Sequence, residues 1–340
     1  MIQETRKLIL LILIAFGWVF SGFPVNELDA AIADIGHWRD SVGGQIPGTT
    51  FGGFDFDQQI RNDGIFTKPN NSTIEFDEAG TYLITATMRD FDSSNGRYQQ
   101  QARAVLTSGT GDLFTTYYTG YNRNDAEDTS WSKLVAVLVN GSVDAQVEIQ
   151  RRRDADAPIG GSVAGASDLQ TVRINPTNYG IYDIGGNANT LGGTTPNTVT
   201  VDRVIDESDI AAIEGSTFVG TNTITVKGDN KRYLVIWSVS MDGADNSRTQ
   251  RIGHLEYDGV DELPTRAYCY TRNSSNEYCG LGTMDILETG TADRDIQVEV
   301  FRGPGVSADQ GGANVDGAIT TDGNGQLIVL ELPDDAEVFR

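Results

Sequence analysis

One pattern occurs twice in this chain, and it constrains the fold more than any other feature of the sequence. A strand-like run at 73–76 leads through an acidic turn that ends in glycine into a longer apolar run that contains Tyr82. The same order recurs where the run 222–226 leads through Lys227–Asn230 into an apolar run that contains Tyr233. The two tyrosines are 151 residues apart, which indicates that the chain repeats itself.

Further matches share this spacing: Arg97 with Arg248, Tyr117 with Tyr268, and Val147–Arg151 with Val298–Arg302. Several matches in one register are hard to obtain by chance. Solenoid repeats are typically about 20–50 residues long, so this period indicates a domain duplication instead. The length of 340 residues suits two domains of ordinary size.

Period-two alternation of apolar and polar residues dominates the chain from residue 48 onward, with turn residues between short runs. Each copy contains about seven or eight strand-like runs, which is typical of a β-sandwich. The predicted fold is therefore all-β, with two tandem antiparallel β-sandwiches. The predicted domains are residues 48–174 and 198–340, with a linker at 175–197.

The N-terminal region reads differently. Residues 1–25 combine a basic start with a short apolar run, which favours either a secretory signal peptide or a retained apolar anchor. The spacing of apolar residues predicts a helix within 26–47, either packed on its own domain or forming a self-associating stalk. The apolar stripe of this helix consists of Leu28, Ile32, Ile35, Trp38 and Val42.

Composition excludes one class of function and leaves a disulfide open. The formal net charge of −23 disfavours binding to nucleic acid, because both surfaces would be negative. Cys269 and Cys279 are the two cysteines of the chain, ten residues apart. They would face each other if residues 269–279 formed a hairpin, and a bridge would require an oxidising compartment.

Two acidic turns are the candidate metal sites. Asp90, Asp92 and Asn95 lie in one turn, and Asp242 and Asp245 lie in the equivalent turn of the second copy. This density of oxygen ligands is compatible with calcium, but it is more typical of ordinary turns between strands. No other cofactor is expected.

Catalytic motifs are not evident. Neither histidine, His37 or His254, has a neighbouring Ser or Cys in a pattern typical of nucleophilic catalysis. The only basic cluster, 151–153, suits pairing with carboxylates of a neighbouring subunit or domain, or a solvated strand end. The aromatic run with Tyr117, Tyr118 and Tyr121 suits packing or stacking on sugar rings. These patterns favour a non-enzymatic protein.

The first copy, within 48–174, shows an Asn-Gly region, an aromatic strand with proline, and Gly-x-Tyr opening a core strand. The residues concerned are Phe54–Phe56, Asn62–Phe66, Pro69 and Ala79–Leu83. On these residues the first copy resembles the jelly-roll superfamily of tumour necrosis factor and the complement globular heads. The second copy matches through Phe218, Thr223–Val226 and Tyr233, but Lys231 and Arg232 replace the Gly-Thr that precedes the tyrosine.

The resemblance implies a trimer-forming sandwich with binding loops at one end. Jelly rolls of this type occur in secreted proteins, and similar ones build phage heads, fibres and collars. We therefore expect a structural or attachment protein, a homotrimer in a virion or an extracellular surface assembly with other subunits. The alternative is a secreted carbohydrate-binding or adhesion module, assisted by calcium.

Overall fold

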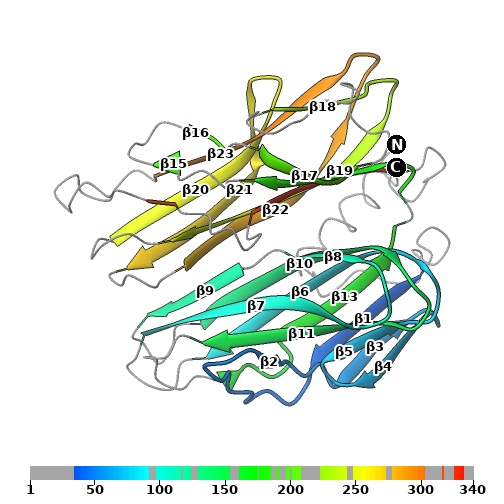
Figure 1. Cartoon of the computed structure of the whole chain (residues 1–340). Coiled ribbons are helices and arrows are strands. Elements are labelled where there is room, and N and C mark those ends of the chain that lie inside the picture. Colours follow the sequence, from blue (N-terminus) through cyan, green and yellow to red (C-terminus); the bar gives the residue numbers. More distant parts are fainter. Residues whose placement is uncertain are drawn as a thin grey trace, which may run out of the picture. The chain divides into compact units, whose positions relative to one another are not determined.

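The computed structural model describes residues 34–91, 97–115, 118–123, 129–153, 161–174, 176–184, 189–190, 197–199, 201–207, 223–242, 248–272, 278–302, 316–317 and 325–332. All regular elements in these ranges are β-strands, and all their pairings are antiparallel (Figure 1). A search of the same ranges for a helix of membrane-spanning length and hydropathy finds none. The chain divides into two compact units at residues 175 and 176.

The first unit contains two sheets. One has the strand order β3 (Gln58–Asn62), β1 (Ile35–Asp40), β13 (Ser167–Arg173), β6 (Gly80–Phe91), β10 (Thr129–Gly141) and β8 (Asp112–Thr115), with β12 (Gly161–Ser162) paired to β6. The other has the order β4 (Phe66–Asn70), β5 (Thr73–Phe76), β11 (Ala145–Arg153), β7 (Arg97–Ser108) and β9 (Tyr118–Arg123), with β2 (Gly52–Gly53) paired to β11.

The second unit repeats this plan. One sheet has the order β17 (Val201–Glu207), β14 (Tyr179–Ile184), β25 (Gln326–Glu331), β19 (Arg232–Asp242) and β22 (Tyr278–Glu288). The other has the order β16 (Asn197–Thr198), β23 (Arg294–Arg302), β20 (Arg248–Tyr257) and β21 (Val260–Arg272), with β18 (Ile224–Val226) paired to β23. A separate pair joins β15 (Asn189–Thr190) to β24 (Asp316–Gly317).

Each unit has its own hydrophobic core between its two sheets. In the first unit Tyr82 and Ile84 of β6 meet Val147 and Ile149 of β11 in one buried cluster. Alternation along each strand sends every second side chain into this cluster, as the period-two pattern predicts. The all-β prediction is confirmed for the described residues, whose strands enclose two separate cores.

The register tyrosines occupy the same place in both units. Tyr82 and Tyr233 are both fully buried near the start of β6 and β19. The hydroxyl of Tyr82 donates to the carbonyl oxygen of Glu78 at 2.6 Å, and that of Tyr233 donates to the carbonyl oxygen of Lys227 at 2.8 Å. The repeat seen in the sequence therefore corresponds to a repeated structural role.

We expect Tyr82→Phe and Tyr233→Phe to lower the free energy of unfolding by similar amounts, about 1 kcal/mol each, because each removes one buried hydrogen bond. Urea denaturation measures the loss. Tyr268→Phe is the control, since Tyr268 is 58% exposed and its change should stay within about 0.5 kcal/mol. A loss at only one of the two buried tyrosines would contradict their equivalence.

The helix predicted within 26–47 is wrong for residues 35–40, which form the strand β1. Ile35 and Trp38 are buried in the first unit, whereas Val42 is 77% exposed. Strand β1 pairs with β13 on one side and β3 on the other, so its backbone groups are satisfied by a sheet. The stripe residues Leu28 and Ile32 and the segment 1–25 lie outside the described residues.

A glycine two positions before an aromatic residue recurs in the equivalent strands β1 and β14. A Cβ atom at Gly36 would lie 2.3 Å from the ring of Trp38, and one at Gly180 would lie 2.3 Å from the hydroxyl of Tyr182. The aromatic side chain thus folds back over its own strand in both units. This close approach requires glycine at both positions.

The predicted domain limits shift accordingly. The first unit includes β1 and so begins before residue 48. Residues 179–184 of the expected linker 175–197 form β14, which lies between β17 and β25 in a sheet of the second unit. The Gly-rich composition around β14 suggested a linker, but its hydrogen-bond partners come from far along the chain.

Cys269 and Cys279 do not face each other in a two-stranded ladder, the arrangement considered for a bridge. Cys269 in β21 pairs with Arg251, and Cys279 in β22 pairs with Met241, so the two cysteines belong to different sheets. The cysteine side chains lie outside the described residues, and the disulfide stays a prediction.

Candidate functional site

An irregularity in the second unit creates the most distinctive polar site in the described part of the chain. Pairing between β20 and β21 shifts between Gly253 and Leu255, so residues 263–266 bulge out of the ladder. The hydroxyl of Thr265 accepts a hydrogen bond from the backbone nitrogen of Leu255 at 2.8 Å and donates to the carbonyl oxygen of Glu262 at 2.7 Å. Thr265 thereby replaces the missing ladder bonds beside His254.

His254 lies at this bulge with two carboxylates around its ring. Its Nε2 atom is 3.2 Å from Oε2 of Glu299 and 3.4 Å from Oδ1 of Asp261. The three side chains come from β20, β23 and β21, and their ligand atoms all lie within 4.8 Å of one another. The His254 side chain is fully buried, Glu299 is 11% exposed and Asp261 is 42% exposed. We call these three residues the His254 cluster.

The electrostatics of the His254 cluster are dominated by burial and by excess negative charge. Burial lowers the pKa of His254 and so favours the neutral imidazole, although the negative charge of Asp261 acts in the opposite direction. Burial, together with the charges of Glu256 and Asp261, raises the pKa of Glu299 to about 7. Arg266 supplies a partly compensating positive charge, with its Nη2 atom 3.4 Å from Oδ2 of Asp261.

The first unit keeps the glutamate but not the histidine. Glu148 occupies the position of Glu299 and pairs with Val105, whereas Glu299 pairs with His254. Glu148 accepts hydrogen bonds from the Ser72 hydroxyl and the Gln150 side-chain amide instead. The His254 cluster is thus specific to the second unit.

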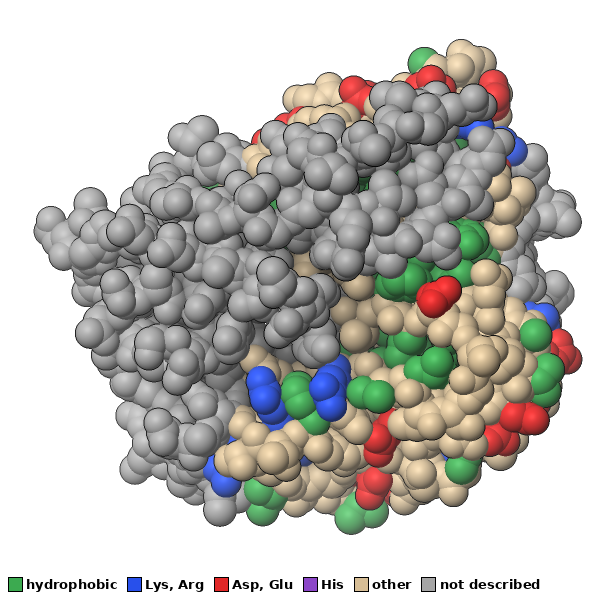
Figure 2. Space-filling view, in the orientation of Figure 1, with side chains coloured by type: hydrophobic (Ala, Val, Ile, Leu, Met, Phe, Trp, Pro, Cys, Tyr) green, Lys and Arg blue, Asp and Glu red, His purple; other side chains and the backbone are tan. Residues whose placement is uncertain are grey.

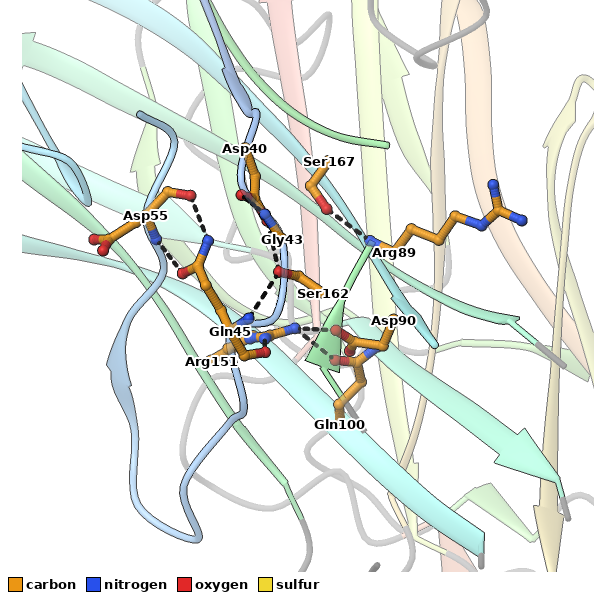
Figure 3. A network of polar contacts seen from close by, with 10 residues as sticks. All are labelled: Asp40, Gly43, Gln45, Asp55, Arg89, Asp90, Gln100, Arg151, Ser162 and Ser167. Atoms are coloured by element: carbon orange, nitrogen blue, oxygen red, sulfur yellow. Dashed lines mark hydrogen bonds and ion pairs between the residues drawn. The ribbon is translucent and has the colours of Figure 1, made fainter. Parts of the chain in front are cut away.

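Of the residues expected to bind calcium, Asp90 has a different role. Its Oδ1 atom accepts a hydrogen bond from Nη1 of Arg151 at 2.5 Å, and the same nitrogen lies 3.4 Å from the side-chain oxygen of Gln100 (Figure 3). Asp90, Gln100 and Arg151 are all buried. Arg151 also donates to the backbone carbonyl oxygen of Gln45.

This buried ion pair anchors a wider polar network that ties the segment after β1 to both sheets (Figure 3). The side-chain amide of Gln45 donates to the carbonyl oxygen of Asp55 and accepts from its backbone nitrogen, both at 2.7 Å. Ser162 donates to Asp40 at 2.6 Å and accepts from the backbone nitrogen of Gln45. The network explains Asp90 as a structural residue.

Arg151 and Arg152 of the basic run 151–153 likewise find partners within the first unit. Arg151 belongs to the buried pair, and Arg152 donates to the side-chain oxygen of Gln101 at 2.7 Å. Arg103 and Arg152 both stack on Phe51, with guanidinium carbons 4.0 and 4.6 Å from the ring centroid. Figure 2 shows basic side chains beside hydrophobic ones in the region of β2 and β11. A neighbouring subunit is therefore not needed to explain this cluster.

The remaining predicted sites are not placed. Asp92, Asn95 and Asp245 lie outside the described residues, as do the side chains of Asp242, Tyr118 and Tyr121 and the whole of Tyr117. Calcium binding at these turns and sugar stacking on the tyrosines stay predictions. His37, by contrast, is placed: its Nε2 atom lies 2.8 Å from Asp168, a carboxylate shared with Arg39.

Sequence reasoning missed the His254 cluster. Its residues are spread over three strands, and His254 is 45 positions from Glu299. One local signal was available: His254 and Glu256 alternate with Leu255 and Tyr257, which places a histidine and a glutamate on one strand face. Only the pairing of β20 with β23 adds the second carboxylate.

Comparisons with known proteins do not assign a family. No protein-family model and no curated protein matches the chain. Murine APRIL is 12% identical over 42% of this chain and 98% of its own, with a TM-score of 0.29. The ANXUR2 extracellular domain from Arabidopsis thaliana is 7% identical over 87% of this chain and 92% of its own, with a TM-score of 0.20.

A tandem CBM22 domain of Xyn10C from Paenibacillus barcinonensis is 11% identical, covers 85% of this chain and 97% of its own, and has a TM-score of 0.18. All these TM-scores are low, so no function is transferred from these proteins.

Proposed function

We propose that the chain is a non-enzymatic structural or attachment protein, built from two jelly-roll units and acting as a homotrimer in a virion or an extracellular surface assembly. The strand orders support the jelly-roll part. One sheet of the first unit contains the order β1-β13-β6-β10, and the equivalent sheet of the second unit contains the order β14-β25-β19-β22. The other sheet joins β5-β11-β7 and β18-β23-β20.

The first of these sheets is apolar on both faces in both units. In the first unit one face of this sheet contributes Tyr82 and Ile84 to the core. We call the opposite face the outer apolar face, and its residues are Leu83, Val135, Val137, Val139 and Val172. In the second unit the face opposite the core holds Ile181, Leu234, Ile236, Ile328 and Leu330.

A sheet that is apolar on both sides needs cover on both sides. Both outer faces are already covered within the chain, because Val137, Val139, Ile181 and Leu330 have no exposed surface. The homotrimer is supported instead by the resemblance of the first unit to trimer-forming jelly rolls. The histidine geometry supports a non-enzymatic role, because the Nε2 atoms of His37 and His254 face carboxylates rather than a hydroxyl or thiol.

Sedimentation equilibrium on the full chain tests the assembly, and the expected mass is three times that of one chain. A wild-type chain that sediments as a monomer at all concentrations would overturn the oligomeric proposal.

A further inference from the structure

We propose that the His254 cluster is a binding site for a first-row divalent transition metal ion, Zn²⁺ in particular, held by Nε2 of His254 and by carboxylate oxygens of Asp261 and Glu299. This goes beyond the structural role proposed above and does not depend on the oligomeric state. The ion would join three strands of one sheet, β20, β21 and β23, at the bulge where the ladder between β20 and β21 is interrupted.

The distances fit a tetrahedral ion. Zinc bonds of about 2.0–2.2 Å to nitrogen and oxygen place neighbouring tetrahedral ligand atoms about 3.3–3.5 Å apart. Nε2 of His254 lies 3.2 Å from Glu299 and 3.4 Å from Asp261. The imidazole nitrogen therefore already stands at coordination separation from each carboxylate, and the ligand atoms of Asp261 and Glu299 lie within 4.8 Å of each other.

The burial of His254 provides an independent observation. Its side chain is fully buried, and neither ring nitrogen makes a hydrogen bond to a described residue. Nε2 is close to both carboxylate oxygens, yet neither oxygen lies where it would accept a hydrogen bond from it. Leaving such a polar atom unpaired in the interior is costly, and a metal ion between the three groups removes that cost.

Charge points the same way. Glu256, Asp261 and Glu299 gather around one ring, and their mutual repulsion is compensated among the described groups by Arg266 at the side of Asp261. A dication would neutralise the remaining excess. The exposed side chain of Asp261 gives the ion a path from solvent and leaves room for water at a fourth position.

The ligand set selects the type of metal. Calcium and magnesium prefer oxygen ligands throughout, whereas imidazole suits zinc and its neighbours in the first transition row. A neutral, buried imidazole with two carboxylates is a nitrogen–oxygen donor set that zinc accepts. We therefore expect Zn²⁺ to bind at this site and Ca²⁺ not to.

Isothermal titration of the chelator-treated full chain with Zn²⁺, and separately with Ca²⁺, tests the proposal. One tight Zn²⁺ equivalent per chain is expected. Asp261→Asn should weaken it by more than the roughly 10–100-fold that loss of an outer-sphere partner costs, since it removes a direct ligand. Asp261 is largely exposed, so this variant should fold, and Glu299→Gln provides a second isosteric test.

Glu148→Gln is the matched control, because Glu148 holds the equivalent strand position in the first unit and faces Val105. It should leave Zn²⁺ binding unchanged. Co²⁺ bound to the wild-type chain should show visible absorption typical of a four-coordinate site, which Asp261→Asn abolishes. Absence of tight Zn²⁺ binding, or equal binding by wild type, Asp261→Asn and Glu299→Gln, would overturn the site.

Discussion

Asp90→Ala should lower the free energy of unfolding of the first unit by about 3–5 kcal/mol, the largest effect we expect from a single charge removal in this chain. The reason is that Arg151, whose side chain is only 3% exposed, would keep its charge in the interior without the carboxylate it contacts. Its remaining partners, Gln100 and the carbonyl oxygen of Gln45, are neutral. Urea denaturation followed by tryptophan fluorescence measures the loss.

The double variant Asp90→Asn, Arg151→Met should be less destabilised than the sum of its single changes. Burial raises the pKa of Asp90 in spite of the adjacent Arg151, which indicates that desolvation outweighs the attraction within the pair. Removing both charges therefore recovers part of the loss. Strict additivity of the two changes would contradict this account of the pair.

Arg61→Met is the control for the Asp90 experiment. Arg61 bonds Asp63 through a comparable contact of 2.9 Å, but both side chains are 26% exposed. Solvent screens such a pair, so its removal should cost less than about 1 kcal/mol. A loss as large as that of Asp90→Ala would mean that burial is not the cause.

Trp38→Ala should destabilise the first unit by about 3–5 kcal/mol, because it leaves a cavity in the core. Trp38 is 2% exposed and packs edge-on against Phe66, with ring centroids 6.2 Å apart. Thermal and urea denaturation of the full chain measure the effect. The same substitution also decides between the strand β1 and the stalk helix expected from the apolar spacing.

Val42→Ala is its matched control. In a stalk helix, Val42 and Trp38 would lie on one stripe, and both substitutions would weaken self-association. In the strand, Val42 is 77% exposed and its replacement should change stability by no more than about 0.5 kcal/mol. A Trp38→Ala chain with unchanged stability and lost oligomerisation would restore the stalk.

Local pattern determined much of this protein. The period-two alternation specifies strands because it matches the pleat of a sheet, and it is readable without knowledge of any partner strand. The spacing of Tyr82 and Tyr233 identified the duplication, and both tyrosines make the same kind of hydrogen bond. These features are encoded within short segments, so the sequence alone was sufficient for them.

Tertiary structure decided what depends on pairing between distant segments. The spacing of Ile35 and Trp38 is compatible with a helix and also with a strand in which both are buried. The strand forms because β13, some 130 residues later, pairs with it. From the sequence, Asp90 was a candidate calcium ligand. The register of β11 places Arg151 beside it, and the two form an ion pair. His254 acquires Glu299 only through the pairing of β20 with β23. Strand register is set by the whole sandwich, because a shift of one residue would turn every side chain to the other face.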